Sequence, residues 1–168
     1  MFPIRDHNPS STTPFVTYAL VGLNVLIFLS YFPGAASESA LGTFYRTWGA
    51  IPASLEPTTL VTSQFLHGGW MHLLGNMLFL WIFGDNLEDR MGHLVFLGFY
   101  LICGVGAALA HVSSDPSSPV PMVGASGAIA GVMGAYLLLF PKAKVDILFI
   151  FVVIFKIIPV PAWVMLGL

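Results

Sequence analysis

Residues 63–84 read SQFLHGGWMHLLGNMLFLWIFG, and this stretch decides the fold because it contains no Asp, Glu, Lys or Arg. A helix needs about 20 predominantly apolar residues to cross the roughly 30 Å of hydrocarbon in a bilayer. Three further intervals between charged residues are comparably apolar, and they cover residues 14–32, 93–111 and 124–140. The sequence therefore predicts an all-α, polytopic membrane helix bundle with four complete transmembrane helices, of which the last is short.

The composition of the chain also indicates that lipid, and not water, surrounds most of it. Hydrophobic residues make up 57% of the 168 residues and charged residues only 8%, against about 25% charged residues in an ordinary soluble domain. The net charge of -2 leaves no basic surface to neutralise phosphates, so we expect no nucleic-acid partner. The single cysteine, Cys103, allows neither an intrachain disulfide nor a thiolate metal cluster. We expect a lipid bilayer around the chain, and no metal or cofactor.

The distribution of basic residues sets the orientation, because Lys and Arg gather in cytoplasmic loops. With a cytoplasmic amino terminus, the outside loops hold only Arg46, while the inside segments hold Arg5, Arg90, Lys142 and Lys144. We therefore expect residues 1–13 to form a cytoplasmic tail and residues 14–168 to form one membrane domain. No targeting extension precedes the first span, so we expect the inner membrane of a bacterium.

The segment after the fourth span contains a β-branched and aromatic run, Val145–Phe155, which is too short to cross a membrane. We interpret this run as an interfacial or re-entrant piece, followed by an incomplete fifth helix that starts near Pro161. The alternative is one kinked fifth span from Val145 onward, which would leave Lys156 buried or extended toward the interface.

The segment Gly124-Ala125-Ser126-Gly127 opens the short fourth span and places a hydroxyl at a helix amino terminus. Free backbone N–H groups and the helix dipole favour an oxyanion there, and the flanking Gly124 and Gly127 let a substrate backbone come close. This arrangement suits acyl transfer at serine. The same pattern also fits a helix cap beside a small-residue packing face, so both interpretations stay open on this motif alone.

The second span offers polar partners for this serine. His72 and Asn76 are four residues apart on one helical face, about 6 Å along the axis. Polar groups inside a membrane are costly and face a cavity or a partner, although they can also serve only as hydrogen bonds between helices. His72, Asn76 and Ser126 all follow outside loops, so they lie at similar depth in the membrane. We expect them to share one site, in which the helix donors form an oxyanion hole.

These motifs resemble the rhomboid family of intramembrane serine proteases, and the resemblance covers about residues 13–168. In that family the serine of Gly-x-Ser-Gly is the nucleophile, and a histidine and an asparagine of the second helix help to bind the oxyanion. The matching residues here are Ser126, His72 and Asn76. The resemblance implies a rhomboid-like fold and an endopeptidase that cleaves transmembrane or juxtamembrane segments of membrane proteins.

The resemblance also assigns residues around the proposed site. His67 matches a histidine with a supporting role, and Glu88 and Arg90 match a structural Glu-x-Arg pair at the inner end of the second helix. A departure from the family is the order Arg46-x-Trp48, where relatives often carry Trp-Arg.

A larger departure concerns the general base, which rhomboids carry as a histidine on the sixth helix. No histidine follows Ser126 in this chain, and a serine hydroxyl needs an adjacent base to become a useful nucleophile. We therefore expect the sequence to be truncated before the sixth helix, and the 168-residue chain to be inactive as it stands.

The same residues bear on four other classes of protein. A zinc peptidase would need His-Glu-x-x-His, but residues 57–84 contain no carboxylate. An intramembrane aspartyl protease would need two aspartates within the spans, and the aspartates all lie in tails or loops. A transporter would account for a short helix, but no inverted repeat is visible. The remaining rival is a catalytically inactive rhomboid-like protein that binds transmembrane clients.

Overall fold

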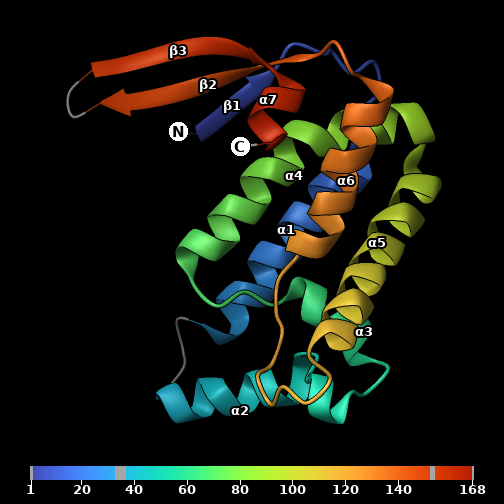
Figure 1. The fold of residues 1–168 in the computed structure, drawn as a ribbon, viewed down its shortest axis with the longest axis vertical. Helices are drawn as coiled ribbons and strands as arrows, with labels where there is room; N and C mark the ends of the chain where they lie inside the picture. Colours follow the sequence, from blue (N-terminus) through green and yellow to red (C-terminus); the bar gives the residue numbers. More distant parts are fainter. Residues whose placement is uncertain (1, 33–36, 152–153, 168) are drawn as a thin grey trace.

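Four helices form the body of the molecule (Figure 1). The computed structural model describes residues 2–32, 37–151 and 154–167. The bundle within these residues consists of α1 (Phe15–Tyr31), α4 (Trp70–Met91), α5 (His93–Ser114) and α6 (Ser126–Leu139). Helix α6 packs against both α5 and α4, and α4 packs against α1. The short helix that begins at Ser126 is therefore held between two longer helices.

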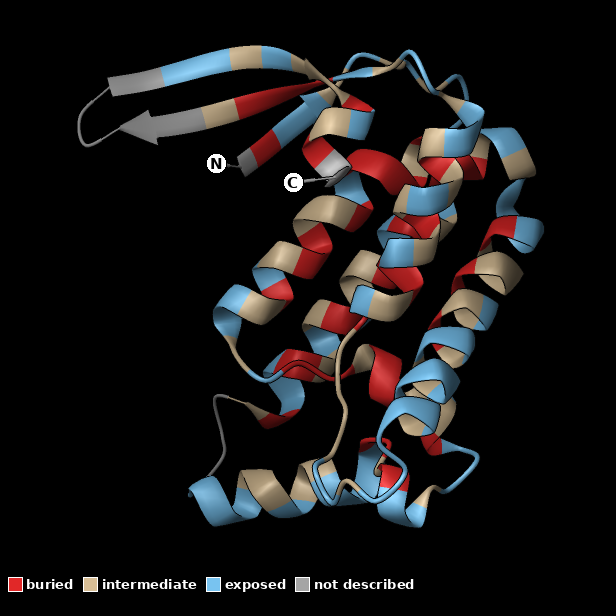
Figure 2. Ribbon diagram, in the orientation of Figure 1, coloured by how far each residue is buried: buried red, intermediate tan, exposed pale blue. Residues whose placement is uncertain are grey.

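Each helix has a buried face and an exposed face (Figure 2), and large apolar side chains occur on both. Fully buried side chains come from all four helices and include Phe28, Leu80, Phe83, Phe96, Tyr100 and Tyr136. On the outer faces, Leu94 and Leu138 are each 84% exposed. A helix that is hydrophobic all round is typical of a core or membrane position. The exposed apolar faces are therefore consistent with lipid around the bundle.

The helices differ in their capacity to cross a membrane. Among the described helices, only α5 is both long enough and apolar enough to cross. Helices α1 and α6 are apolar but have 17 and 14 residues. Helix α4 has 22 residues but ends in the charged segment Asp85–Arg90. The count of four complete transmembrane helices therefore stays a prediction.

The second predicted span begins later than expected. Residues 63–69 do not belong to α4, because Ser63–Phe65 form the 3-10 helix η2 after the short helix α3 (Thr59–Thr62). The pair Gly68-Gly69 then separates η2 from α4. Glycine loses more backbone entropy in a helix than other residues, which favours a break at this point. As a result, His67 lies in the loop that leads into α4.

Two long loops pack together at one end of the bundle, which we call the loop end (Figure 1). The first contains α2 (Glu38–Trp48) and the 3-10 helix η1 (Pro52–Ser54). The second follows α5 and meets the first at a two-residue bridge, where the Ala50 N–H donates to the Met122 carbonyl at 3.1 Å and the Met122 N–H donates to the Ala50 carbonyl at 2.8 Å. This bridge fixes the chain that leads into Ser126.

The opposite end, the sheet end, carries a three-stranded antiparallel sheet in the order β1-β2-β3 (Figure 1). Its strands are β1 (Phe2–Asp6), β2 (Lys144–Phe151) and β3 (Ile154–Pro161), and α7 (Ala162–Gly167) follows. The all-α prediction is therefore wrong for the sheet end, and the interfacial piece from Val145 onward is a strand of a hairpin. Its β-branched and aromatic residues favour strands. The alternative of one kinked span is excluded over the described part of this segment.

Hydrogen bonds attach the amino-terminal segment to the sheet end. The Arg5 Nε donates to Asp146 at 2.8 Å, and His7 Nε2 lies 2.7 Å from the same carboxylate. The Tyr136 hydroxyl of α6 donates to Asp6 at 2.7 Å. Hydrogen bonds from His7 and then from Arg5 lower the pKa of Asp146 below its usual range. The segment expected as a polar tail thus forms an edge strand.

Glu88 of α4 caps the amino terminus of α1. Its carboxylate accepts the backbone N–H of Val16 at 2.8 Å and that of Thr17 at 2.7 Å, and it also accepts the Thr17 hydroxyl at 2.7 Å. His93 Nδ1 contacts the same carboxylate. Helix α1 follows Pro14 and has no side-chain cap from its own N-cap residue. A carboxylate from α4 therefore satisfies the free donors of α1.

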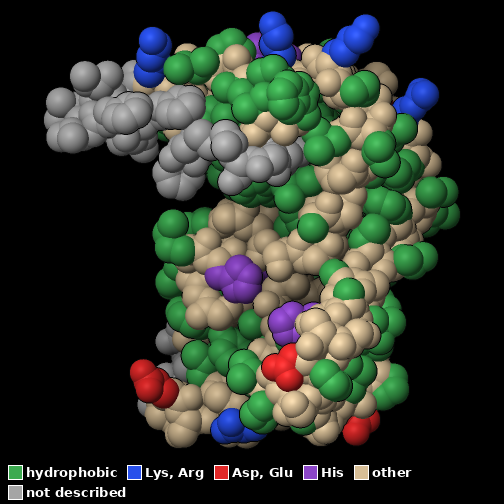
Figure 3. All heavy atoms as spheres, in the orientation of Figure 1, with side chains coloured by type: hydrophobic (Ala, Val, Ile, Leu, Met, Phe, Trp, Pro, Cys, Tyr) green, Lys and Arg blue, Asp and Glu red, His purple; other side chains and the backbone are tan. Residues whose placement is uncertain are grey.

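Charged side chains are distributed unevenly along the molecule (Figure 3). Lys and Arg side chains gather mainly at the sheet end, and the middle of the visible face shows none. This is the distribution of a polytopic protein with one positively charged side.

Candidate active site

Ser126 is the first residue of α6, and its side chain is exposed. Ala125 precedes it as the N-cap residue and makes no side-chain cap bond, so within the described residues no local side chain occupies this helix end. The first backbone N–H groups of a helix have no partner inside the helix, and negative charge is favoured beside them. The structure thus places a hydroxyl where an oxyanion is stabilised.

Gly124 brings the Ser126 hydroxyl and an imidazole of α4 to the same point. A Cβ atom on Gly124 would lie 3.7 Å from Ser126 Oγ and only 2.7 Å from His72 Nε2. Gly124 also has a φ of 129°, which side chains other than that of glycine rarely allow. Its N–H donates to the Ser63 carbonyl at 2.9 Å, which anchors the turn. His72, Gly124 and Ser126 therefore meet, although the whole of α5 separates them in sequence.

A backbone hydrogen bond assigns the tautomer of His72. The Gly68 N–H donates to His72 Nδ1 at 3.3 Å, so Nδ1 is an acceptor. In a neutral imidazole the other nitrogen then carries the proton. His72 Nε2, the atom that faces Gly124, is therefore a hydrogen-bond donor. A donor in this position suits an oxyanion hole better than the removal of a proton from serine.

The other two polar residues predicted for the site, Asn76 and His67, are buried and have side-chain nitrogens without partners among the described residues. Asn76 lies one turn after His72 on α4, and its Nδ2 has no hydrogen-bond partner among the described residues. The same holds for both ring nitrogens of His67, whose ring centroid lies 5.1 Å from that of His72. Buried polar groups without partners are rare. His67 therefore lies beside His72 with unused hydrogen-bonding capacity, and Asn76 carries an unused donor on the same helix as His72.

The His67 backbone is held in place by two tyrosines. The Tyr31 and Tyr45 hydroxyls both donate to its carbonyl oxygen at 2.8 Å, and its N–H lies 2.7 Å from the Tyr31 oxygen. Tyr31 belongs to α1 and Tyr45 to α2. The turn that precedes His72 is therefore fixed by two other elements of the bundle.

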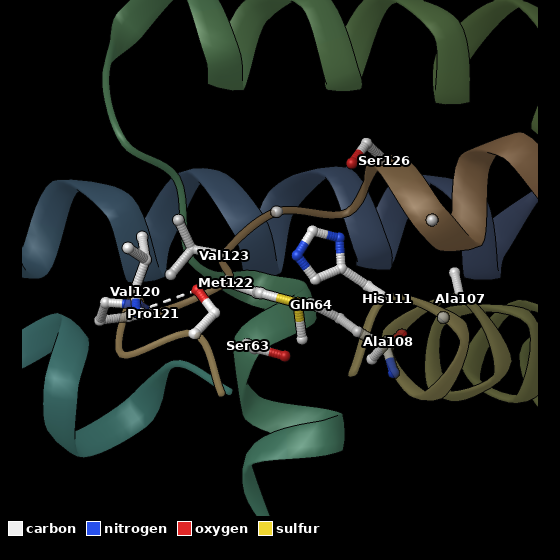
Figure 4. A pocket seen from close by; sticks show the side chains of 14 residues that line it. Ser63, Gln64, Ala107, Ala108, His111, Val120, Pro121, Met122, Val123 and Ser126 are labelled. Atoms are coloured by element: carbon white, nitrogen blue, oxygen red, sulfur yellow. Dashed lines mark hydrogen bonds between the residues drawn. The ribbon is translucent and has the colours of Figure 1, made fainter. Parts of the chain in front are cut away.

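A cavity of about 500 Å³ opens beside Ser126, between α5 and the segment before α6. Figure 4 shows the Ser126 hydroxyl and the His111 ring projecting into it from different helices. Gly124 and Gly127, predicted to allow a substrate to approach, also line it. A Cβ on Gly127 would lie 2.5 Å from the Cβ of Ala107, so Gly127 is also needed where α6 meets α5.

Sequence reasoning did not single out Gln64, which lines the same cavity and is only 3% exposed. A Gln inside an otherwise apolar stretch was the available signal. His111 ends the third predicted span, but only the fold places it at the same cavity as Ser126. Glu88 and Arg90 lie away from this site, on the last turn of α4 at the sheet end. Among the described residues, no group of three or more His, Cys, Asp or Glu is placed to hold a metal.

Comparison with known proteins assigns this arrangement to a family. The family model described as the rhomboid domain matches residues 54–168. The chain is 31% identical to the mitochondrial Rhomboid protein 1 of Saccharomyces cerevisiae over 89% of its length and 42% of that protein. It is 36% identical to the rhomboid protease GluP of Bacillus subtilis over 74% of its length and 24% of that protein. It is 38% identical to RHOMBOID-like protein 5 of Arabidopsis thaliana over 55% of its length and 31% of that protein. The chain thus spans less than half of the curated relatives that it matches.

These matches correct the expected location. Relatives from yeast and Arabidopsis thaliana include proteins named mitochondrial and chloroplastic. The expectation of a bacterial inner membrane conflicts with these organellar relatives and is withdrawn. That expectation rested on the amino-terminal residues alone, and no feature of the helix bundle supported it. A location within a membrane agrees with the family and with the exposed apolar faces of the bundle.

Proposed function

The chain belongs to the rhomboid family, and from this we propose that the protein is an intramembrane serine endopeptidase with Ser126 as its nucleophile. Its substrates are transmembrane proteins, cleaved in or near their membrane segments. The single observation that supports this most is the convergence of His72 Nε2 and Ser126 Oγ at Gly124. A hydroxyl and a donor that meet beside a helix amino terminus are the parts that acyl transfer requires.

The proposed reaction begins when Ser126 Oγ attacks a peptide carbonyl carbon and a general base removes the hydroxyl proton. The carbonyl oxygen becomes an oxyanion, which accepts hydrogen bonds from His72 Nε2, the Asn76 amide and the Ser126 N–H. Collapse of this intermediate breaks the peptide C–N bond, and the base returns its proton to the leaving amine. Water then hydrolyses the acyl-enzyme and restores the hydroxyl. Removal of one such oxyanion donor typically costs about 2.7–4 kcal/mol of transition-state stabilisation.

The proposed activity depends on a general base that can remove the proton of Ser126. All five histidines of the chain precede Ser126. The tautomer of His72 presents a donor rather than an acceptor toward the serine. We therefore assign the activity to a chain that also supplies a histidine base after Ser126, as the rhomboid resemblance implies, and we expect negligible cleavage from residues 1–168 alone.

Covalent labelling tests the proposal directly. A full-length protein that carries such a histidine should react with a serine-directed fluorophosphonate, and Ser126→Ala should abolish the reaction. His72→Phe should slow labelling at least tenfold, because it removes the donor that faces the oxyanion. Ser10→Ala, far from the site, is the control. Labelling that survives Ser126→Ala would contradict the assignment of the nucleophile.

A catalytically inactive rhomboid-like protein that binds transmembrane clients is the second candidate. The observation that favours it is the tautomer of His72, whose Nε2 faces Gly124 as a donor and not as a base. Photo-crosslinking from the cavity would separate the two functions. Stable crosslinks to an intact transmembrane client, with no cleavage product and no labelling of Ser126, would favour the binding protein over the protease.

A further inference from the structure

A second cavity lies at the loop end, between α1 and α2, and we call it the α2 groove. Its volume is about 320 Å³, at the lower end of the range of about 300–1,000 Å³ that is typical of ligand pockets. It shares no lining residue with the cavity beside Ser126, so the two are separate. Its walls come from α1, from α2 and from the segment before α4, and consist of Ile27, Phe44, Trp48, Thr62, Phe65 and Leu66.

The α2 groove is almost wholly apolar. Apolar atoms make up nearly all of its lining, and the hydroxyl of Thr62 donates to the Trp48 carbonyl at 2.7 Å. A buried water needs about two to four polar partners, so water is a poor occupant. An unfilled groove would lose the dispersion contacts of its walls. An apolar ligand is therefore the class of molecule that fits.

The α2 groove adjoins the surface of α1 that meets lipid. Ile27 lies four residues after Leu23, so their side chains are neighbours on one face of α1. Leu23 is 44% exposed, and Leu26, next to Ile27 in sequence, is 67% exposed. Because α1 covers most of the first predicted span, these exposed side chains face acyl chains. The groove is therefore continuous with the lipid-facing side of the bundle.

Helix α2 places the groove at the depth where acyl chains begin. The helix runs across the loop end of the bundle (Figure 1) and is amphipathic. Phe44 and Trp48, four residues apart, line the groove, whereas Arg46 lies between them in sequence and is exposed. An amphipathic helix of this kind lies in the membrane interface, with its apolar face about 5–10 Å into the boundary between headgroups and acyl chains.

We propose that the α2 groove binds one acyl chain of a phospholipid from the leaflet at the loop end. An acyl chain is slender, apolar and already present at this depth. Inside the groove it contacts α1, α2 and the segment before α4 at once, so it makes more dispersion contacts than a chain that lies against one helix. Among the described residues no Lys or Arg lines the groove, so the site selects the chain and not the headgroup. The inference holds whether or not the protein cleaves substrates.

Quenching of Trp48 fluorescence by a brominated phospholipid tests the site. Trp70→Phe, Trp81→Phe and Trp163→Phe together leave Trp48 as the single tryptophan of the protein, which is purified in detergent. Phosphatidylcholine brominated on one acyl chain should quench Trp48 in a saturable way, with an end point near about one lipid per protein. A second single-tryptophan variant keeps only Trp81, which is 55% exposed on α4 outside the groove. Its quenching should rise with the brominated share of the micelle, without saturation.

Two matched substitutions on α1 locate the acyl chain. Ile27→Phe adds bulk within the groove and should raise the lipid concentration for half-maximal quenching of Trp48 by about fivefold. Leu26→Phe adds bulk at the adjacent, lipid-exposed position outside the lining and should leave that concentration unchanged. Thermal unfolding in the same detergent checks that both variants are folded. Thr62→Leu, which fills the groove from the segment before α4, replaces Ile27→Phe if the latter does not fold.

Each outcome decides the inference. Saturable quenching of Trp48 that Ile27→Phe weakens and Leu26→Phe does not supports the acyl-chain site. Quenching of Trp48 that rises without saturation, as at Trp81, indicates ordinary lipid contact and overturns the inference. Saturable quenching that Ile27→Phe leaves unchanged places the lipid elsewhere and also overturns it. Absence of quenching does the same, and light scattering then shows whether a second copy of the chain covers the groove.

Discussion

Gly124 meets two requirements at once, and both follow from its missing side chain. Its φ of 129° lies in a region that favours glycine, and its Cα faces His72 so closely that a Cβ would stand 2.7 Å from Nε2. The same missing atom leaves room for the imidazole at the turn that leads into Ser126. The residues that carry the proposed chemistry are therefore placed by a neighbour that has no functional group of its own.

Replacement of Gly124 by Ala should impair both folding and reactivity. The added Cβ overlaps His72 Nε2 and imposes a strained backbone, which costs about 1–3 kcal/mol. We expect lower thermal stability in detergent and at least a tenfold loss of Ser126 labelling, because His72 is displaced. Gly106→Ala is the matched control, since a Cβ at Gly106 meets nothing within 4 Å. Equal behaviour of the two variants would argue against the placement of His72 at Gly124.

At the scale of single elements, the helices depend on one another for their ends and their spacing. Helix α1 has no side-chain cap from its own N-cap residue and takes one from Glu88 of α4. Helix α6 approaches α5 so closely that Gly127 and Ala107 leave no space for a further carbon. Each helix forms from its own sequence, but the cap at its end and its distance from the next helix depend on residues of other helices.

Glu88→Gln should destabilise the bundle by about 1–3 kcal/mol, because hydrogen bonds to a buried charged acceptor are lost and an amide N–H₂ is turned toward backbone donors. Denaturant unfolding in detergent measures this change. Arg90→Gln is the control, because Arg90 is exposed and makes no ion pair within the described residues. A loss for Arg90→Gln as large as that for Glu88→Gln would show that the Glu-x-Arg pair acts as a unit.

Gly127→Ala should separate α6 from α5. The new Cβ would lie 2.5 Å from the Cβ of Ala107, and overpacking of this kind typically costs about 1–3 kcal/mol. Gly134→Ala lies on the same helix in open space and should be neutral or stabilising by up to about 1 kcal/mol. Thermal unfolding of the two variants in the same detergent compares them. A neutral Gly127→Ala would contradict the close approach of the helices.

At the scale of the whole molecule, the sheet joins the two ends of the described chain. Strand β1 from the amino-terminal segment pairs with β2, which follows α6. The Asp146 carboxylate on β2 holds Arg5 and His7 of the amino-terminal segment. The sheet end is therefore closed by contacts that no single helix contains, while the site lies toward the loop end.

Acid should release the amino-terminal strand before the bundle unfolds. The pKa of Asp146 is lower in the folded protein than its usual value, because His7 and Arg5 bind the ionised form. A lowered carboxylate pKa adds stability that is present above the usual value and is lost as the pH falls through the folded value. We expect amide hydrogen exchange of residues 4–6 to accelerate below about pH 4, and Asp146→Asn to accelerate it already at pH 7. Protection of these amides that is unchanged in Asp146→Asn would rule out this attachment.

The sequence by itself determined the helices and the motifs. Apolar intervals between charges located α1, α5 and α6 to within a few residues, since burial of apolar groups and the length of a helix are local properties of the chain. The spacing of His72, Asn76 and Ser126 led to the rhomboid family, whose model then matched residues 54–168.

Only the tertiary structure decided the sheet, the cap on α1 and the lining of the cavity. Each depends on residues far apart in sequence: Arg5 with Asp146, Glu88 with Thr17, and Gln64 with Gly104. A local pattern records how readily a segment becomes a helix or a strand, but not which distant donor will meet its carboxylate. Because long-range pairs form only once the chain has packed, the sequence predicted an all-α bundle where the folded chain closes with a sheet.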